Sequence, residues 1–157
     1  MNLFVRRKEY TFLDRYDVLD DTSRLVLTAD GKLTRLHGHL TMRDRAGKVM
    51  FSIHKHPMPF FANYSIRDRD FEFAKMKQSF SFFPTFHVDG QAGAYTIKGN
   101  LRAHDFEILH DGVAYGKIHR RLLKWGDCYV LAFSNTEDVP LFCALTIALD
   151  NAMYHNI

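Results

Sequence analysis

Residues 40–53 read LTMRDRAGKVMFSI. Apolar and polar residues alternate over a short first run, a turn with Asp44 and Gly47 follows, and a second short run rich in apolar residues completes the segment. Asp and Gly between two alternating runs indicate a β-hairpin. If Arg43 pairs with Lys48, then Leu40 faces Phe51, Met42 faces Val49 and Gly38 faces Ile53 on one side of the hairpin. Polar residues fall on the other side: His37, His39, Thr41, Ser52, His54 and His56. This separation predicts two antiparallel strands with one buried face.

The same pattern recurs along the chain. Acidic residues in the expected turns lie 24, 24, 21 and 22 residues apart, at Asp20, Asp44, Asp68, Asp89 and Asp111. With further strands expected near residues 3–7 and 127–134, the sequence predicts about twelve short strands. Closure removes exposed edges, so we expect a closed or nearly closed antiparallel barrel.

The last segment differs from the rest. Residues 139–154 are apolar nearly all round, which predicts a helix buried on every side. Pro140 suits a first helical turn, and Thr136 or Asp138 is the expected cap. A membrane span needs about 20 residues, and this run is shorter and carries Asp150 and Asn151. We therefore expect a single domain, residues 1–157, whose central helix fills a mainly β barrel, with a tail anchor as the alternative.

Composition limits the partners without naming one. The net charge is +3 and the pI about 8.9, which permits contact with anionic lipid or nucleic acid but requires neither. Cys128 and Cys143 form no CxxC motif, and we expect both to be reduced. The N-terminal apolar run is too short for a signal peptide. We expect a cytoplasmic protein, peripheral at a membrane if lipid is its ligand.

Several segments together resemble the LURP-one-related family, whose fold is the Tubby C-terminal-like barrel shared with phospholipid scramblases. The similar segments span the whole chain and are residues 65–68, 75–84, 95–100, 108–112, 125–129 and 144–150. The resemblance implies a twelve-stranded barrel around a central C-terminal helix, but no agreed activity. Tubby-like relatives bind phosphoinositides through a basic pocket, and scramblases act at membranes. The long proline-rich N-terminal arm and the longer C-terminal helix of scramblases are absent here.

Basic residues followed by aromatic ones recur at expected strand ends. Among the cations of these four clusters, the expected ligand-binding residues are Arg6, Arg7, Lys55, Lys75, Lys77, Arg120, Arg121 and Lys124. In a barrel such clusters could gather at one rim, where cations and aromatics suit an anionic phospholipid or phosphoinositide surface. The alternative is that the aromatics belong to the core and the cations are solvated strand ends.

Histidines suggest a second kind of site. The pairing above places His37 opposite His54, with His39 and His56 on the same outer face, and two His-x-His pairs can bring imidazoles within reach of a metal. A polar outer face without metal is the alternative.

Catalytic templates are missing from the sequence, which has no Gly-x-Ser-x-Gly, phosphate-binding Gly loop or His-Glu-x-x-His. We therefore expect a non-enzymatic binding or scaffold module without a cofactor. Its ligand is an anionic lipid or a protein partner, and nucleic acid is not favoured.

Overall fold

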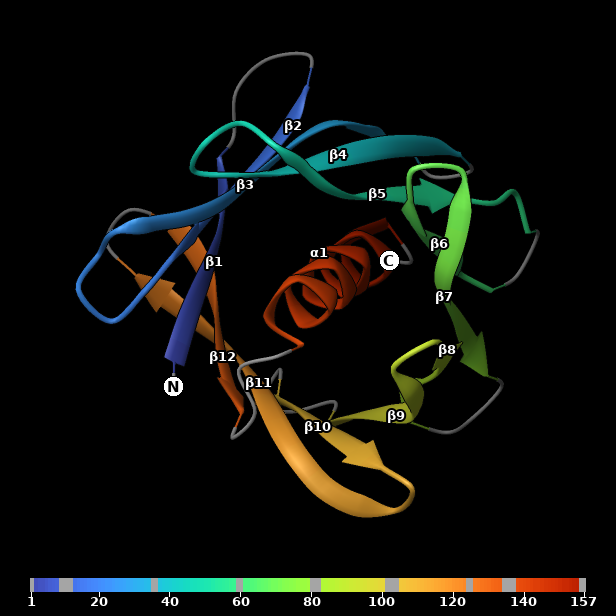
Figure 1. Cartoon of the computed structure of the whole chain (residues 1–157). Helices are drawn as coiled ribbons and strands as arrows, with labels where there is room; N and C mark the ends of the chain where they lie inside the picture. Colours follow the sequence, from blue (N-terminus) through green and yellow to red (C-terminus); the bar gives the residue numbers. More distant parts are fainter. Residues whose placement is uncertain are drawn as a thin grey trace.

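The computed structural model describes residues 2–8, 13–34, 37–58, 61–79, 83–100, 105–123, 126–133 and 138–155. Twelve antiparallel strands form a closed barrel around one helix (Figure 1). Each strand pairs with its neighbours in the chain, and β1 pairs with β12, from Asn2 opposite Ala132 to Arg6 opposite Cys128. The strands are β1 (Asn2–Lys8), β2 (Asp14–Leu19), β3 (Leu25–Leu33), β4 (Gly38–Asp44), β5 (Val49–Lys55), β6 (Asn63–Asp68), β7 (Phe71–Ser79), β8 (Thr85–Gly90), β9 (Gly93–Asn100), β10 (Asp105–His110), β11 (Val113–Leu123) and β12 (Gly126–Phe133).

The predicted fold class is therefore confirmed, but the register of the β4–β5 hairpin was predicted wrongly. Leu40 faces Ile53, Met42 faces Phe51 and Arg43 faces Val49, with a bulge after Met42. The turn closes one residue later than expected, because the Asp44 carboxylate accepts the backbone N–H groups of Ala46 and Lys48 at 2.9 Å each.

As a consequence of this shift, Val49 is not in the core but 49% exposed. His54 faces His39 instead of His37.

The first hairpin uses the same turn chemistry. Asp20 Oδ1 accepts the backbone N–H groups of Thr22 at 2.8 Å and Arg24 at 3.0 Å. Ser23 in this turn and Gly47 in the next adopt positive φ, 64° and 84°. The turn acids thus replace backbone partners that the strands no longer supply.

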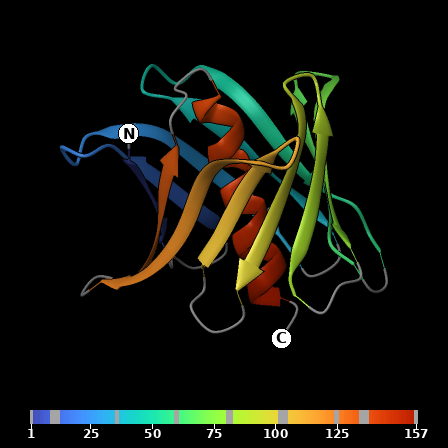
Figure 2. The same cartoon turned by 90° about the horizontal axis from the view of Figure 1, so that it is seen from below.

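The helix α1 (Val139–His155) passes through the barrel (Figures 1 and 2). Every residue from 141 to 152 is buried, as expected for a segment that is apolar all round. The Phe142 N–H donates to the Asp138 carbonyl at 3.0 Å, so Asp138 lies at the cap position. Thr136, the other expected cap, lies outside the described residues. Among the described helices, none is long and apolar enough to cross a membrane.

Alternating strand direction gives the barrel two different ends. At one end, which we call the exit end, β1, β3, β5, β7, β9 and β11 finish together with the helix. Arg7 near the end of β1 lies 3.9 Å from Asp150, and Lys55 at the end of β5 bonds to Asn151, which places both strand ends beside the end of α1. At the opposite, hairpin end, the helix begins and the five tight hairpins turn.

Candidate functional site at the exit end

Strand alternation divides the predicted basic clusters between the inside and the outside of the barrel. In β1, Arg7 points inward to Asp150, whereas Arg6 points outward to Asp17. In β11, Arg120 lies opposite the inward-pointing Tyr129 of β12, so Arg120 also points inward, whereas its neighbour Arg121 is exposed on the outside. Adjacent cations of one cluster therefore do not share a ligand surface.

Lys55 lies inside the barrel. Its residue is only 7% exposed, its Nζ donates to Asn151 Oδ1 at 2.8 Å, and the same nitrogen lies 5.5 Å from the centre of the Tyr64 ring. This lysine binds the helix, so it is not placed to meet a ligand on the outer surface.

Lys75 and Lys77 are exposed on β7, which lies six strands from β1 in either direction around the barrel. Lys75 Nζ lies 3.8 Å from Glu72, which offsets part of its charge. Lys124 lies outside the described residues. Among the described residues, the structure therefore brings most of the predicted cations toward one end of the barrel, but on different sides of it, and it places Lys75 midway along β7.

A polar cluster fills the exit end of the lumen around Asp150. The Asp150 carboxylate accepts hydrogen bonds from the Tyr16 hydroxyl at 2.6 Å and the Tyr129 hydroxyl at 2.9 Å. Burial and the Asp150 charge hold the pKa of Tyr16 well above its ordinary value, so Tyr16 stays a neutral donor. The adjacent Asn151 accepts a hydrogen bond from Tyr64 at 2.6 Å.

Sequence reasoning noted Asp150 and Asn151 but did not find this cluster. The available signal was the inward position of Tyr16, Tyr64 and Tyr129 on strands that otherwise bury apolar residues.

On the outer surface, one buried carboxylate holds three cations together. Asp17 has a side chain only 6% exposed and lies 2.6 Å from Lys8, 3.6 Å from Arg6 and 3.7 Å from Arg15. One negative charge against three positive ones leaves a local excess of cation. Arg121 extends this surface, because it pairs with Cys128, which in turn pairs with Arg6. Lys8 and Arg15 were not among the predicted site residues.

Cys128 between these arginines is not an activated thiol. Burial raises its pKa, although Arg6 and Arg121 act in the opposite direction. A raised pKa keeps the thiol protonated and weakly nucleophilic.

The two ends of the barrel carry opposite charge. The three residues of each strand nearest the exit end contain nine cations and four acids, a net charge of +5. The corresponding residues at the hairpin end contain two cations and five acids, a net charge of −3, and one of these acids is Asp17, which binds the exit-end cations Arg6, Lys8 and Arg15. The exit-end cations that point outward, which we call the cationic ring, are Arg6, Lys8, Arg15, Lys32, Lys77, Lys98 and Arg121.

A model of the LURP-one-related family matches residues 1–150, which include all twelve strands of the barrel and most of its helix. The chain belongs to the LURP-one-related family. It is also 26% identical to a protein of Bacillus subtilis (strain 168) described as the uncharacterized protein YxjI, over 99% of this chain and 96% of the relative. No solved structure matches the chain.

The four histidines of the predicted metal site, His37, His39, His54 and His56, lie on the outer surface of this LURP-one-related barrel but do not converge on one point. The rings of His39 and His54 stack with centroids 5.6 Å apart. His54 Nε2 lies 2.9 Å from Ser52 Oγ, and burial, followed by the Arg67 charge, lowers the pKa of His54.

The other two histidines of the predicted metal site have different surroundings. His56 Nε2 lies 2.6 Å from Ser65 Oγ, which donates to Glu72 at 2.7 Å. His37 is exposed. Within the described ranges, no group of three or more His, Cys, Asp and Glu is placed to hold a metal ion.

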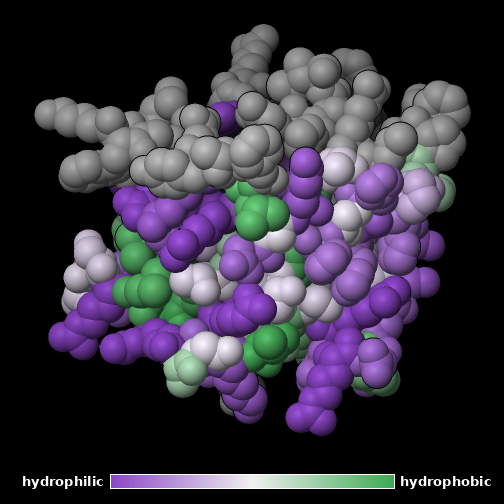
Figure 3. All heavy atoms as spheres, turned by 90° about the horizontal axis from the view of Figure 1, so that it is seen from above, coloured by the Kyte–Doolittle hydropathy of each residue, from purple (hydrophilic) through white to green (hydrophobic). Residues whose placement is uncertain are grey.

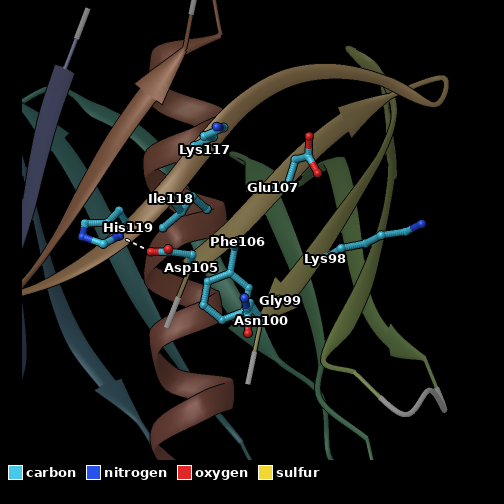
Figure 4. Close-up of a pocket in the computed structure, with 9 residues that line it drawn as sticks. All are labelled: Lys98, Gly99, Asn100, Asp105, Phe106, Glu107, Lys117, Ile118 and His119. Carbon is cyan, nitrogen blue, oxygen red and sulfur yellow. Dashed lines mark hydrogen bonds and ion pairs between the residues drawn. The ribbon is translucent and has the colours of Figure 1, made fainter. Parts of the chain in front are cut away.

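A hollow of about 480 Å³ lies on the outer wall of this family member, over β9, β10 and β11 (Figure 4). His119 pairs with Asp105 at one side, and Lys98 and Lys117 stand around Glu107. Both side chains of the His119–Asp105 pair are 46% exposed. Because the charges in the hollow are mixed, it is a weaker anion site than the surface around Asp17.

Proposed function

We propose that this LURP-one-related barrel is a non-enzymatic module that binds anionic phospholipid headgroups, including phosphoinositides, through its cationic ring. The observation that carries the proposal is the charge difference between the two ends, +5 against −3 over equivalent strand positions. Each Lys or Arg near an anionic lipid surface contributes roughly 1 kcal/mol of attraction. Several such residues at one end give that end a clear preference for anionic surfaces.

The closed lumen supports a binding role over a catalytic one. Barrel enzymes and carriers often use the interior, but here buried helix residues occupy it from 141 to 152. Cations on the outer wall can meet a headgroup without opening the barrel. Both cysteines are free and buried, which suits a reducing compartment, and we place the module in the cytoplasm at the membrane surface.

The test is co-sedimentation with neutral, acidic and phosphoinositide-doped vesicles at two salt concentrations. Two variants with the same change in net charge are compared: Lys32→Glu with Arg121→Glu at the exit end, and Arg45→Glu with Lys48→Glu at the hairpin end. All four side chains are exposed, so both variants should fold. We expect salt-sensitive binding to anionic vesicles, about tenfold weaker or more in the exit-end variant only.

Equal loss in both variants would show that net charge alone drives binding. If the wild type bound no vesicle, the lipid proposal would fail, and a protein-interaction or structural domain would be the better description.

A further inference from the structure

Seven large apolar side chains are exposed among the described residues, and they divide between the two ends. Leu13, Met58 and Phe83 are 59%, 46% and 51% exposed, and each lies within three residues of a strand terminus at the exit end. The other four are the first residues of strands at the hairpin end: Leu25, Val49, Phe71 and Val113.

Elsewhere, hydrophilic side chains predominate. Figure 3 shows one side of the barrel, on which hydrophilic groups surround small separate groups of apolar side chains.

The surroundings of the two apolar sets differ in charge. Leu13 is followed by β2 with Arg15, and Met58 and Phe83 lie at the same positively charged end. At the hairpin end, Phe71 follows Asp70 whereas Leu25 and Val49 follow Arg24 and Lys48, but the strand termini together are net negative. An anionic bilayer therefore attracts the exit end and repels the hairpin end, so only the exit end combines charge complementarity with apolar groups.

We infer that the exit end docks end-on to an anionic bilayer and inserts Leu13, Met58 and Phe83 between the lipids, while the cationic ring meets the headgroups. This inference rests on the proposed function and narrows it: the ligand is the bilayer surface, and a soluble phosphorylated headgroup is not a sufficient partner. The helix then stands with its C-terminal end toward the membrane.

Insertion and charge respond differently to salt. Salt screens the attraction between exposed cations and lipid, but it does not weaken the burial of apolar side chains. If the protein binds through both its cations and its inserted apolar side chains, part of the vesicle binding should persist at high salt as a salt-resistant fraction. Such binding is also stronger on small, highly curved vesicles, whose loosely packed lipids expose more acyl surface.

The experiment compares two triple variants by co-sedimentation with acidic vesicles at low and high salt. Leu13→Ala, Met58→Ala and Phe83→Ala remove the exit-end set, and Leu25→Ala, Val49→Ala and Val113→Ala form the matched control. Because these residues are 39–69% exposed, each change disturbs packing less than a substitution in the core would. We expect the first triple to bind at least about tenfold more weakly and to lose its salt-resistant fraction, and the control to bind within about twofold of wild type.

A second measurement reports the orientation directly. Leu13→Cys and Val49→Cys are labelled with a polarity-sensitive fluorophore; the native Cys128 and Cys143 are 2% and 0% exposed and so react slowly. Vesicles should shift the emission of the probe at position 13 to the blue and leave the probe at 49 unchanged.

The two proposals fail in different ways. A wild type that binds vesicles, with equal effects of the two triples or a blue shift at position 49, would overturn the end-on insertion while leaving lipid binding in place. Equally tight binding of inositol hexakisphosphate would also overturn it, because that probe has no bilayer. A wild type that binds no vesicle would overturn both proposals.

Discussion

The two ends of the central helix are held in different ways. At the hairpin end, Phe142 packs among aromatic rings, with centroid distances of 5.1 Å to Tyr115, 5.2 Å to Tyr95 and 5.7 Å to Phe133. At the exit end, Asp150 and Asn151 make hydrogen bonds to strand side chains. The first end combines apolar contact with hydrogen bonds from the Tyr115 and Tyr95 hydroxyls to Asp138, at 3.0 Å and 3.5 Å, whereas the second end is stabilised mainly by directional polar contact.

The two kinds of contact contribute differently to the position and the stability of the helix. Apolar contact is non-directional and supplies most of the free energy of burial. A fully apolar helix in an apolar lumen could also sit rotated or displaced along its axis with little penalty. The hydrogen bonds at Asp150 and Asn151 can form in only one position, so they fix the rotation and depth of α1. That polar groups specify the arrangement here is a hypothesis that the following variants test.

Phe142→Ala should have the largest effect, because it removes a fully buried ring from the aromatic group. We expect a loss of about 3–5 kcal/mol in the free energy of unfolding, measured by denaturant titration. Leu145→Ala in the middle of the helix should lose about 2–5 kcal/mol, and the exposed Val113→Ala under about 0.5 kcal/mol. A loss below about 0.5 kcal/mol at Phe142 or Leu145 would contradict a helix-filled lumen.

Asn151→Ala should have an intermediate effect, since it leaves Lys55 and Tyr64 without their shared acceptor. We expect a loss of about 1–3 kcal/mol. The triple variant Asn151→Leu, Lys55→Met and Tyr64→Phe replaces all three partners by apolar groups and should regain part of that stability. In the triple variant, broader amide NMR signals would show that the helix has lost its single position. Sharp signals would instead refute the specifying role of these hydrogen bonds.

Alkaline pH should have the smallest effect per group. Burial raises the pKa of Tyr64, and it raises that of Cys143 to about 12. An acid whose pKa is raised on folding stabilises the fold below its unfolded pKa and loses that contribution as the pH rises. The free energy of unfolding should therefore start to fall at about pH 9 because of the Cys143 thiol and at about pH 10 because of Tyr64. For each of these groups the loss is about 1.4 kcal/mol for every pH unit above that point.

Tyr64→Phe isolates one of these groups. Between pH 8 and 11, thermal or denaturant unfolding should show about 1.4 kcal/mol less loss in this variant than in the wild type. Parallel pH profiles would mean that Tyr64 ionises as easily in the folded protein as in the unfolded chain.

Local patterns predicted the strands and the helix because both depend on neighbouring residues. The run at 139–154 was expected as a helix and the structure has Val139–His155. The β4–β5 register was missed because it depends on the Asp44 side chain and a bulge, which alternation does not reveal. The inward position of Lys55 could have been read from Ile53, two residues earlier on the same face.

The polar cluster was harder to foresee for a physical reason. The hydrogen bond from Tyr16 to Asp150 joins residues 134 positions apart, and it depends on which strand the helix end meets. The same holds for part of the cationic ring, because Arg121 lies beside Arg6 only when β1 and β12 close the barrel. Non-local juxtaposition, not residue type, limited the prediction of the site.

The position of the central helix in the chain also affects the order in which the barrel can fold during synthesis. The helix follows all twelve strands in the chain, so the ribosome releases the wall of the barrel before the segment that fills it. Until residues 139–155 emerge, the inward apolar faces have no partner, and partly made chains with such exposed surface are prone to aggregate. Completion of the barrel core is therefore tied to the emergence of the helix: a nascent chain halted before residue 139 should need a chaperone.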